Sequence, residues 1–106
     1  MISIDEFKKM EIKVAKIVEV KEHPQADKLY VLTVDTGTQT KQLVAGIKKF
    51  YQPQELLNKN VVIVDNVQPA TIRGVESQGM VLAASDTAGL TLITPEKPIS
   101  IGSIVR

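Results

Sequence analysis

The pattern of apolar and polar positions predicts a chain made mainly of β-strands. After Glu11, apolar side chains recur at every second position, which is the period of a half-buried strand, and Lys16 is the one polar residue in the series. This strand is expected to end at His23-Pro24, because proline restricts the residue before it and cannot donate to a β-ladder. We expect the alternate apolar side chains to share the buried face: Ile12, Val14, Val18 and Val20.

Turn-forming residues divide the rest of the chain into shorter predicted strands. Asp35-Thr36-Gly37 is typical of a turn, and the segment 69–74 is predicted to be a loop. A tail interrupted by proline and glycine follows the last strand. The strands predicted after the first are 29–34, 40–45, 60–67, 79–84 and a short one at 90–93.

Two short helices are predicted between these strands and before them. Ser3 followed by Glu6 fits a capping box at the start of an N-terminal helix, in which each side chain binds the other residue's backbone N–H. Pro53 suits the first turn of a second helix over 53–57. Glu55 favours the N-terminal end of that helix, and Asn58 lies past its C-terminus.

This order of elements predicts one all-β domain over residues 1–106. Five strands with a short helix between the third and the fourth is the order of an OB-fold, a small, partly open Greek-key barrel. A short N-terminal helix and a C-terminal extension complete the expected architecture. Periodicity alone does not separate this barrel from an SH3-like one, and the position of the 53–57 helix favours the OB-fold.

Composition narrows the chemistry open to the chain. Its 106 residues are 43% hydrophobic and 24% charged, which is the balance of a folded globular domain, and its net charge is +1. Without cysteine it has no thiol nucleophile, disulfide or cysteine metal ligand, and its single histidine, His23, lies in a predicted turn. It has no glycine-rich phosphate loop and no serine nucleophile motif. We therefore expect no catalysis, no metal and no cofactor.

No segment suggests insertion into a membrane or secretion. The longest tight apolar runs, 61–64 and 80–84, are far shorter than the ~18–20 residues of a membrane-spanning helix. The N-terminus has acids ahead of its lysines and no long apolar region, unlike a signal peptide. Together with the absence of cysteine, these features favour the cytoplasm.

Three segments carry a more specific signature: HPQADKLY at 23–30, LVAGIKKFY at 43–51 and RGVESQGMVLAAS at 73–85. With them the chain resembles, from about Ile4 to Val105, the tRNA-binding OB-fold domain at the C-terminus of many methionyl-tRNA synthetases. The same domain occurs as a separate β subunit, as a free-standing bacterial tRNA-binding protein and in the endothelial monocyte-activating polypeptide group. The SQGM segment is the most specific part of the resemblance.

The resemblance implies a binding function without chemistry. A domain of this family binds the body of folded tRNA by shape, near the outer corner of the L, and acts as a homodimer. As an appendage it raises the local tRNA concentration for the catalytic subunit of methionyl-tRNA synthetase. Only Tyr30 is a plausible strand aromatic, so stacking of single-stranded bases is poorly supported. Apolar residues in both terminal segments support the dimer: Ile2, Ile4, Phe7, Ile99, Ile101, Ile104 and Val105.

The resemblance also implies which residues contact tRNA. Lys28 matches the family's lysine at the start of the second strand and would contact phosphate, and Asn66 matches the asparagine that ends the fourth strand. Ser77 and Met80 match the RNA-facing positions of the SQGM segment, with Gln78 as a donor beside them. The structural alternatives are a solvated lysine at 28, a turn-forming asparagine at 66 and a core methionine at 80.

One departure from the family pattern lowers the expected affinity. After the proline that follows the fourth strand, family members often carry two basic residues, where this chain has Ala70 and Thr71. Arg73 is expected to replace part of that charge. Losing two phosphate contacts would flatten the salt dependence of the affinity by nearly two units, at ~0.7–0.9 per phosphate. Further lysines are expected to join the patch: Lys41, Lys48 and Lys49.

Two other functions remain open for this sequence. One is an export-related chaperone of the same fold, a dimer that binds extended peptides, although such chaperones lack the Ala-Gly-Ile and SQGM segments seen here. The other is a scaffold protein that joins a synthetase complex through the barrel alone. Binding to whole tRNA, duplex RNA and unfolded peptide distinguishes these possibilities.

Overall fold

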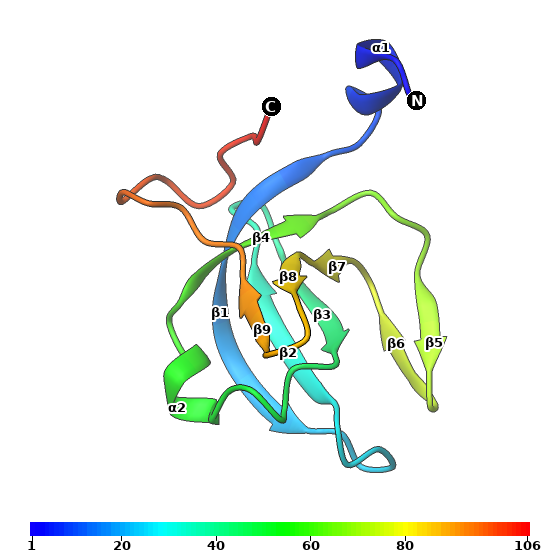
Figure 1. Cartoon of the computed structure of the whole chain (residues 1–106), viewed down its shortest axis with the longest axis vertical. Helices are drawn as coiled ribbons and strands as arrows, with labels where there is room; N and C mark the ends of the chain where they lie inside the picture. The colour runs from blue at the N-terminus through cyan, green and yellow to red at the C-terminus, as the bar shows by residue number, and fades with distance from the viewer.

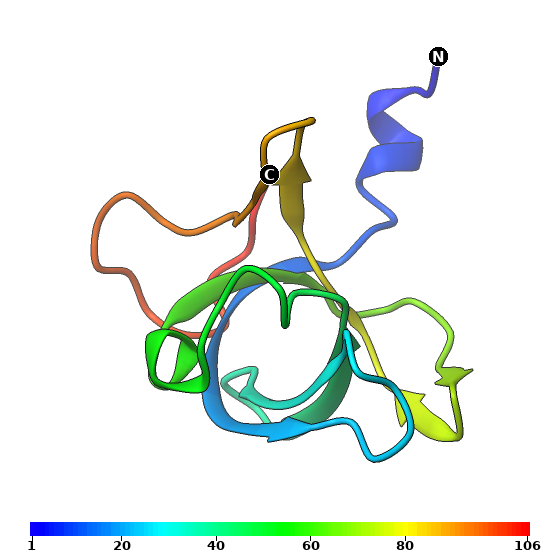
Figure 2. The same cartoon turned by 60° about the horizontal axis from the view of Figure 1, so that its bottom comes forward.

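A five-stranded antiparallel sheet, curved into a barrel, forms the centre of the computed structural model, which describes all residues 1–106 (Figure 1). Viewed from its end, the sheet closes into a ring (Figure 2). The order of strands in the sheet is β3-β2-β1-β4-β7. This is the five-stranded, OB-fold-like barrel that the sequence predicts. Its strands are β1 (Ile12–Glu22), β2 (Tyr30–Asp35), β3 (Thr40–Ala45), β4 (Asn60–Val64) and β7 (Met80–Val81).

The barrel is closed by one backbone hydrogen bond and by polar side chains rather than by a full β-ladder. The backbone N–H of Gln78 donates to the carbonyl of Gln42 on β3 at 2.8 Å, and the Gln42 N–H donates to Gln78 Oε1 at 2.9 Å. One residue pair further along, the Val44 N–H donates to Ser77 Oγ at 3.0 Å. Backbone groups on the edge of β3 are therefore satisfied by the segment that precedes β7, as buried backbone groups require.

The first strand has a bulge that changes which side chains are buried. Its register shifts between Ile17 and Glu19, so the two halves of β1 present opposite parities to the barrel interior. Ala15 and Ile17 lie in the main core, whereas Val18 is 38% exposed. The prediction that Val18 shares the buried face with Ile12 is therefore wrong, because strict alternation does not survive an extra residue in the strand.

The C-terminal extension acts as a partner for the first half of β1. Val14 donates its N–H to the Ser103 carbonyl at 2.9 Å and accepts from the Gly102 N–H at 2.7 Å, while the Val105 N–H donates to the Ile12 carbonyl at 2.8 Å. This pairing covers a small second apolar cluster of Ile12, Val62 and Val64. Val81 of β7 packs against the main core, which fills the barrel with side chains from β1 to β4, from the loop after β3, from α2 (Pro53–Leu56) and from β9 (Leu90–Leu92): Ala15, Ile17, Tyr30, Leu32, Val34, Leu43, Ala45, Ile47, Leu56, Val61, Ile63 and Leu92.

Both predicted helices are present. Helix α1 (Ile4–Phe7) begins at Ser3 with the predicted capping box, in which Ser3 Oγ accepts from the Glu6 N–H at 3.1 Å. Helix α2 (Pro53–Leu56) follows β3 and buries only Leu56. Helix α1 buries no residue and projects from the barrel as an arm (Figures 1 and 2).

The segment between β4 and β7 is more regular than predicted. The expected loop 69–74 is instead the first half of a hairpin, in which β5 (Ala70–Ile72) pairs with β6 (Val75–Ser77). Its turn consists of Arg73 and Gly74, with φ of 53° and 88°. Positive φ at both central residues is what a type I′ turn requires, and this turn matches the twist of the two strands.

The predicted strand 79–84 is divided in two. β7 pairs with β4, and after Leu82 the chain changes partner so that β8 (Ala83–Ser85) pairs with β9 (Leu90–Leu92). The fourth strand ends at Val64 rather than at position 67, because Asp65 and Asn66 leave the ladder for other partners described below. None of the helices has the length and apolar character needed to cross a membrane.

Candidate nucleic-acid interface

Two unpaired cations meet where the loop after β1 approaches the β5–β6 hairpin. The loop, residues 23–29, and the hairpin lie side by side in both views of the ribbon (Figures 1 and 2). Lys28 is exposed and pairs with no acid, and Arg73 extends from the hairpin turn. They line a notch of about 440 Å³, formed by residues 25–29 and Arg73. In an OB-fold this loop and the one between the last two barrel strands are the usual binding loops.

A buried histidine joins the two sides of this notch. The ring of His23 is 6% exposed, with Nε2 3.0 Å from the Ile72 carbonyl oxygen in the hairpin. On its other side, Nδ1 accepts from the Gln25 N–H at 3.0 Å. The sequence indicated only a turn residue at this position. The histidine beside Pro24, in a chain with no other histidine, was the available signal for a more specific role.

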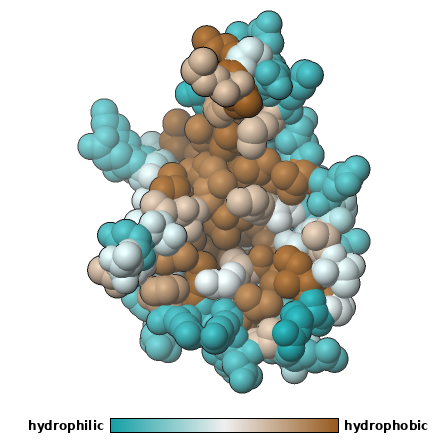
Figure 3. Space-filling view, turned by 45° about the vertical axis from the view of Figure 1, so that its right-hand side comes forward, coloured by the Kyte–Doolittle hydropathy of each residue, from teal (hydrophilic) through white to brown (hydrophobic).

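An apolar groove lies on the other side of the hairpin from the notch. It encloses about 460 Å³ between β3, the hairpin and β7–β8, and it has Met80 on its rim, 53% exposed. Figure 3 shows apolar side chains gathered in a hollow on this face, with hydrophilic residues around its lower edge. The groove and the notch share the hairpin as a common wall, since Ile72 lines the groove and Arg73 the notch.

No aromatic side chain is exposed on a strand. Tyr30 is 3% exposed, and its hydroxyl donates to the Tyr51 carbonyl at 2.8 Å. Tyr51 lies in the loop before α2 and accepts the Leu92 N–H on its own hydroxyl at 3.0 Å. Phe7 and Phe50 are exposed but belong to the arm and to the loop after β3. The sheet therefore offers no platform for stacking bases.

The structure places Ser77 and Gln78 inside the seam that closes the barrel. Ser77 is 5% exposed; its Oγ accepts from the Val44 N–H and donates to the Gly79 carbonyl at 2.9 Å. Gln78 is partly buried and holds the edge of β3 as described above. The segment SQG thus has a structural task that its sequence did not reveal. Gly79 belongs to this task as well, because an added Cβ would lie 2.9 Å from Leu43 Cδ2 and 3.1 Å from the Val64 carbonyl oxygen.

Replacing Gly79 with alanine is therefore expected to destabilise the barrel. The new methyl group has to push back a buried leucine and a backbone carbonyl, and overpacking of this kind costs about 1–3 kcal/mol in the free energy of unfolding. Gly89 is the matched control, because a Cβ added there meets nothing within 4 Å. Urea unfolding of G79A and G89A tests the difference, and equal stabilities of the two variants would contradict the close packing at Gly79.

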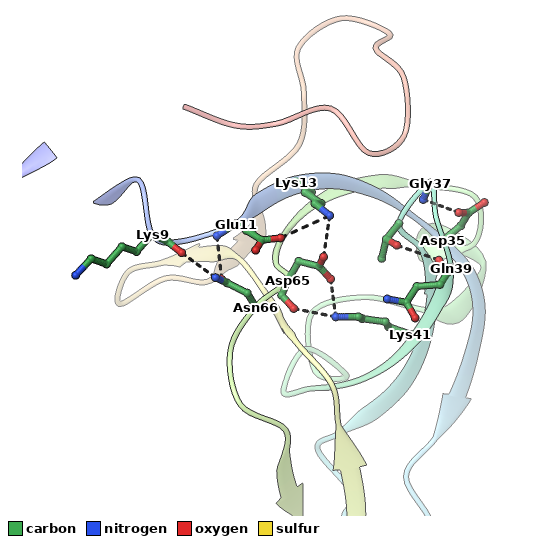
Figure 4. Close-up of polar contacts among 10 residues, drawn as sticks. Lys9, Glu11, Lys13, Asp35, Gly37, Gln39, Lys41, Asp65 and Asn66 are labelled. Atoms are coloured by element: carbon green, nitrogen blue, oxygen red, sulfur yellow. Dashed lines mark hydrogen bonds and ion pairs between the residues drawn. The ribbon is translucent and has the colours of Figure 1, made fainter. Parts of the chain in front are cut away.

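Lys41 belongs to an ion-pair network rather than lying free on the surface (Figure 4). Its Nζ is 2.7 Å from Asp65 Oδ1 and donates to the Asp65 carbonyl at 2.8 Å, while Lys13 Nζ donates to Oδ2 at 2.9 Å. Burial alone would raise the pKa of the Asp65 carboxyl, but the hydrogen bonds from Lys41 and Lys13 outweigh it and hold that pKa below its ordinary value of 3.8.

Because the pKa of Asp65 is lowered in the folded chain, acid is expected to decrease the free energy of unfolding. A carboxyl whose pKa is lower in the folded than in the unfolded chain stabilises the fold above its ordinary pKa, and this contribution is lost as the pH falls through the folded value. D65N is expected to lower the free energy of unfolding by about 2–3 kcal/mol at pH 7, since two lysines lose their partner. The gap between wild type and D65N, measured by urea unfolding, should stay constant from pH 7 to about pH 5 and shrink below about pH 4. A gap that persists unchanged to pH 2 would contradict the pairing.

Asn66 connects the end of β4 to the N-terminal arm (Figure 4). Its Oδ1 accepts from the Glu11 N–H at 2.9 Å, and its Nδ2 donates to the Lys9 carbonyl at 2.7 Å. The Asp65 N–H adds a bond to the Glu11 carbonyl at 2.7 Å. Asn66 therefore does not line the notch, and its hydrogen bonds hold the segment from which α1 extends.

The two further lysines of the predicted patch differ from each other. Lys48 donates to Glu22, and this hydrogen bond raises the pKa of the lysine above its ordinary value. Lys49 is exposed in the loop after β3. The structure therefore brings Lys28 and Arg73 together and places Met80 on the adjoining groove, while Lys41, Asn66, Ser77 and Gln78 are engaged within the chain. No group of three or more histidine, aspartate or glutamate side chains is arranged to hold a metal ion.

The partly open five-stranded barrel places the chain in the class of OB-fold domains, which bind oligonucleotides and oligosaccharides. Residues 12–104 match the family model described as "Putative tRNA binding domain", and the chain belongs to that family.

Relatives of known name agree with this assignment. The chain is 51% identical over 105 residues to a methionine–tRNA ligase of Pyrococcus horikoshii, a match that covers 99% of this chain and 14% of the ligase. The chain therefore spans only a small part of such relatives. Among solved structures, a MetRS-related protein from Pyrococcus horikoshii is 33% identical with a TM-score of 0.92, covering 100% of this chain and 98% of that one. The CsaA chaperone protein from Picrophilus torridus is 32% identical with a TM-score of 0.92 and complete coverage of both chains.

Proposed function

We propose that this chain binds folded tRNA without catalysing a reaction, and that the notch formed by residues 25–29 and Arg73 receives the RNA backbone. The observation that carries the proposal is the convergence of Lys28 and Arg73, two exposed cations from different loops that form no ion pair, in a notch whose one acidic lining residue is Asp27. Phosphate contacts from lysine and arginine supply most of the affinity of RNA- and DNA-binding proteins and position the nucleic acid.

The surroundings of the notch favour a folded RNA over a single strand. Binding of single strands usually uses aromatic platforms, and this sheet exposes none. A folded RNA presents phosphates and 2′-hydroxyls at fixed positions, which two cations and an adaptable apolar side chain can recognise by shape. In this proposal Met80 contacts a sugar or a base edge at the rim of the groove.

The other predicted contacts support the interface from within. Lys41, Asn66, Ser77 and Gln78 are already hydrogen-bonded inside the chain, so we propose that they contribute by holding β3, the hairpin and the arm in place. Replacing any of them would affect RNA binding through the shape of the interface. Lys28, Arg73 and Met80 then form the direct contact surface.

We propose a role beside methionyl-tRNA synthetase in the cytoplasm, and the named relatives support it. The chain matches a segment that makes up 14% of a methionine–tRNA ligase. A tRNA-binding domain fused to such an enzyme, or associated with it, raises the effective concentration of tRNA at the catalytic part. We propose this role for the present chain, whether it works as part of a longer enzyme or as a separate protein.

We further propose that the arm pairs two copies of the chain. Helix α1 buries none of its residues, and with the C-terminal extension it forms an apolar cleft of about 320 Å³. Large apolar side chains remain exposed on both segments, including Ile4 at 73% and Ile104 at 57%. A second copy would cover them in a two-fold symmetric contact, which for a stable pair buries about 1,200 Å² or more.

A charged substitution in the arm tests the pairing. F7E is expected to convert the dimer to a monomer, because Phe7 lines the cleft and the new carboxylate would be buried against apolar residues. F50E is the matched control, since Phe50 is 46% exposed in a loop outside the cleft. Light scattering after size exclusion measures the mass. A wild-type chain that stays monomeric at high concentration, or an F7E variant that remains dimeric, would refute the proposed contact.

The likeness to a CsaA chaperone makes peptide binding the competing function, since an apolar groove is present. A competition experiment separates the two. Labelled whole tRNA is bound to the chain at low salt and challenged with unlabelled tRNA, a plain RNA duplex and an unfolded peptide. We expect tRNA to displace the label at a much lower concentration than the duplex or the peptide. Peptide as the best competitor would favour a chaperone, and equal competition by duplex would argue against recognition of the folded tRNA shape.

A further inference from the structure

We propose that His23 is a positioning residue that holds Lys28 and Arg73 at the spacing needed for RNA binding, an inference that rests on the proposed function. The ring is buried between the loop 23–29 and the hairpin, and it is the only side chain that hydrogen-bonds to both at this point. It touches no other titratable side chain by hydrogen bond or ion pair, so its bonds serve the backbone alone.

The hydrogen bonds determine the state of the ring. Nδ1 accepts from the backbone N–H of Gln25, which always carries its hydrogen, so Nδ1 presents a lone pair. The proton of the neutral ring is then on Nε2, which donates to the Ile72 carbonyl at 3.0 Å. Only this tautomer satisfies both contacts. The two sides of the ring thus have different tasks, one toward the loop and one toward the hairpin.

The bond to the hairpin ends next to a cation, and the bond within the loop ends three residues before one. Ile72 immediately precedes Arg73, and the carbonyl of Gln25 accepts from Arg73 Nη2 at 3.4 Å. The loop that begins at Gln25 leads to Lys28 three residues later. The ring therefore links the two cationic segments at their bases, and without it the loop and the hairpin turn are tied only by the long contact from Arg73.

Two amide replacements test the two hydrogen bonds of the ring separately. In H23N, the amide oxygen takes the place of Nδ1 and can accept from Gln25, but the side chain does not reach Ile72. In H23Q, the amide nitrogen reaches the place of Nε2 and can donate to the Ile72 carbonyl. If the link to the hairpin sets the spacing of the cations, H23Q should keep most of the tRNA affinity, and H23N and H23A should each lose about tenfold.

A double-mutant cycle shows whether His23 acts through Lys28. The affinity for whole tRNA is measured at low salt for H23A, K28A and H23A/K28A, and in parallel for H23A/M80A. We expect K28A to lose about tenfold and the double variant H23A/K28A to lose little more, because the displaced loop has already removed Lys28 from the RNA. The effects of H23A and M80A should multiply, as independent sites do.

A variant in the core serves as the control for loss of stability. Ile63 is fully buried in β4, away from the notch, and I63V lowers the free energy of unfolding modestly without touching the loop or the hairpin. It should bind tRNA as the wild type does.

Nitrogen chemical shifts of the His23 imidazole should report the Nε2–H tautomer in the free protein. If H23A fails to fold, the comparison of H23N with H23Q gives the same answer.

The outcomes separate this inference from the proposed function. If K28A leaves tRNA affinity unchanged, the notch is not the RNA site and the proposed function itself fails. If K28A weakens binding but H23A and H23N bind as wild type, or if the losses from H23A and K28A multiply to about a hundredfold, His23 only stabilises the fold and the positioning role is overturned. A ring protonated on Nδ1 would overturn it as well.

Discussion

Removing both cations of the notch is expected to weaken tRNA binding about a hundredfold at low salt. In K28A/R73A the RNA backbone loses two charge-assisted contacts, each worth about 1.5 kcal/mol or more. The slope of log affinity against log salt concentration should fall by about 1.4–1.8, at ~0.7–0.9 per phosphate. Filter binding or gel shift over a range of salt concentrations measures both quantities. Stability should change little, because neither side chain is buried.

The control removes the same charge elsewhere. Lys59 and Lys97 belong to segments on the α2 side of the barrel, away from the hairpin (Figure 1). K59A/K97A has the same net charge as K28A/R73A but leaves the notch intact, so it should bind tRNA within about twofold of wild type at physiological salt, where distant charges are screened. Equal losses in the two double variants would show that net charge, and not the notch, determines the affinity.

Adding charge to the hairpin is expected to have a smaller effect in the opposite direction. Ala70 and Thr71 are exposed on β5, directly before the turn that holds Arg73. A70K/T71K adds two lysines to the hairpin, the one at position 70 on the rim of the groove, and should raise tRNA affinity roughly tenfold or more at low salt. The salt slope should become steeper by one to two units. Thr71 lies opposite Glu76, but an exposed pair of this kind is weak and leaves most of the new charge available.

A neighbouring threonine and alanine elsewhere in the chain provide the control. Thr87 and Ala88 are exposed in the loop between β8 and β9, which lies apart from the hairpin in Figure 2. T87K/A88K adds the same two charges through the same substitutions. It should produce a much smaller gain in affinity and a smaller change in salt slope than A70K/T71K. A gain of the same size would indicate attraction by net charge alone.

The architecture was largely readable from the sequence, for physical reasons. Period-two alternation and turn residues place β3 at 40–45, as predicted, and proline with the capping residues places both helices. These are local signals, and the structure satisfies them locally. The misplaced residue in β1, Val18, is a different case, because a bulge depends on how two neighbouring strands pair and leaves no mark on the alternation of a single strand.

In the candidate site, too, some features could be predicted from the sequence and others depend on contacts between distant residues. The family resemblance points to Lys28, and Arg73 lies close to the positions where family members often carry basic residues. The structure exposes both side chains, as is usual for long charged residues. What Ser77 and Asn66 do inside the chain could not be predicted, since their partners are Val44 and the backbone at Lys9 and Glu11, far away along the sequence. A small polar residue has the same appearance in a sequence whether it contacts a ligand or closes a barrel.

The charge distribution explains how a chain with a net charge of +1 can still bind an anionic partner. Lys13 and Lys41 pair with Asp65, Glu11 Oε1 lies 3.9 Å from Lys13 Nζ, and Lys48 pairs with Glu22, so these lysines contribute little field outside the molecule. The notch is different, because its two cations come from two loops and form no ion pair, and Asp27 is the one acid that lines it. Attraction of RNA therefore depends on a local patch, which predicts weak long-range steering and strong dependence on orientation.

The most direct test of the RNA-binding surface is a titration of the labelled chain with whole tRNA, followed by nuclear magnetic resonance. The largest shifts should fall on the backbone amides of 25–29 and 71–75 and on the Met80 methyl group, with the α2 side of the barrel unchanged. Shifts centred on α2 and the 93–100 segment, or no shifts at low salt with saturating tRNA, would show that this barrel does not receive tRNA at the notch.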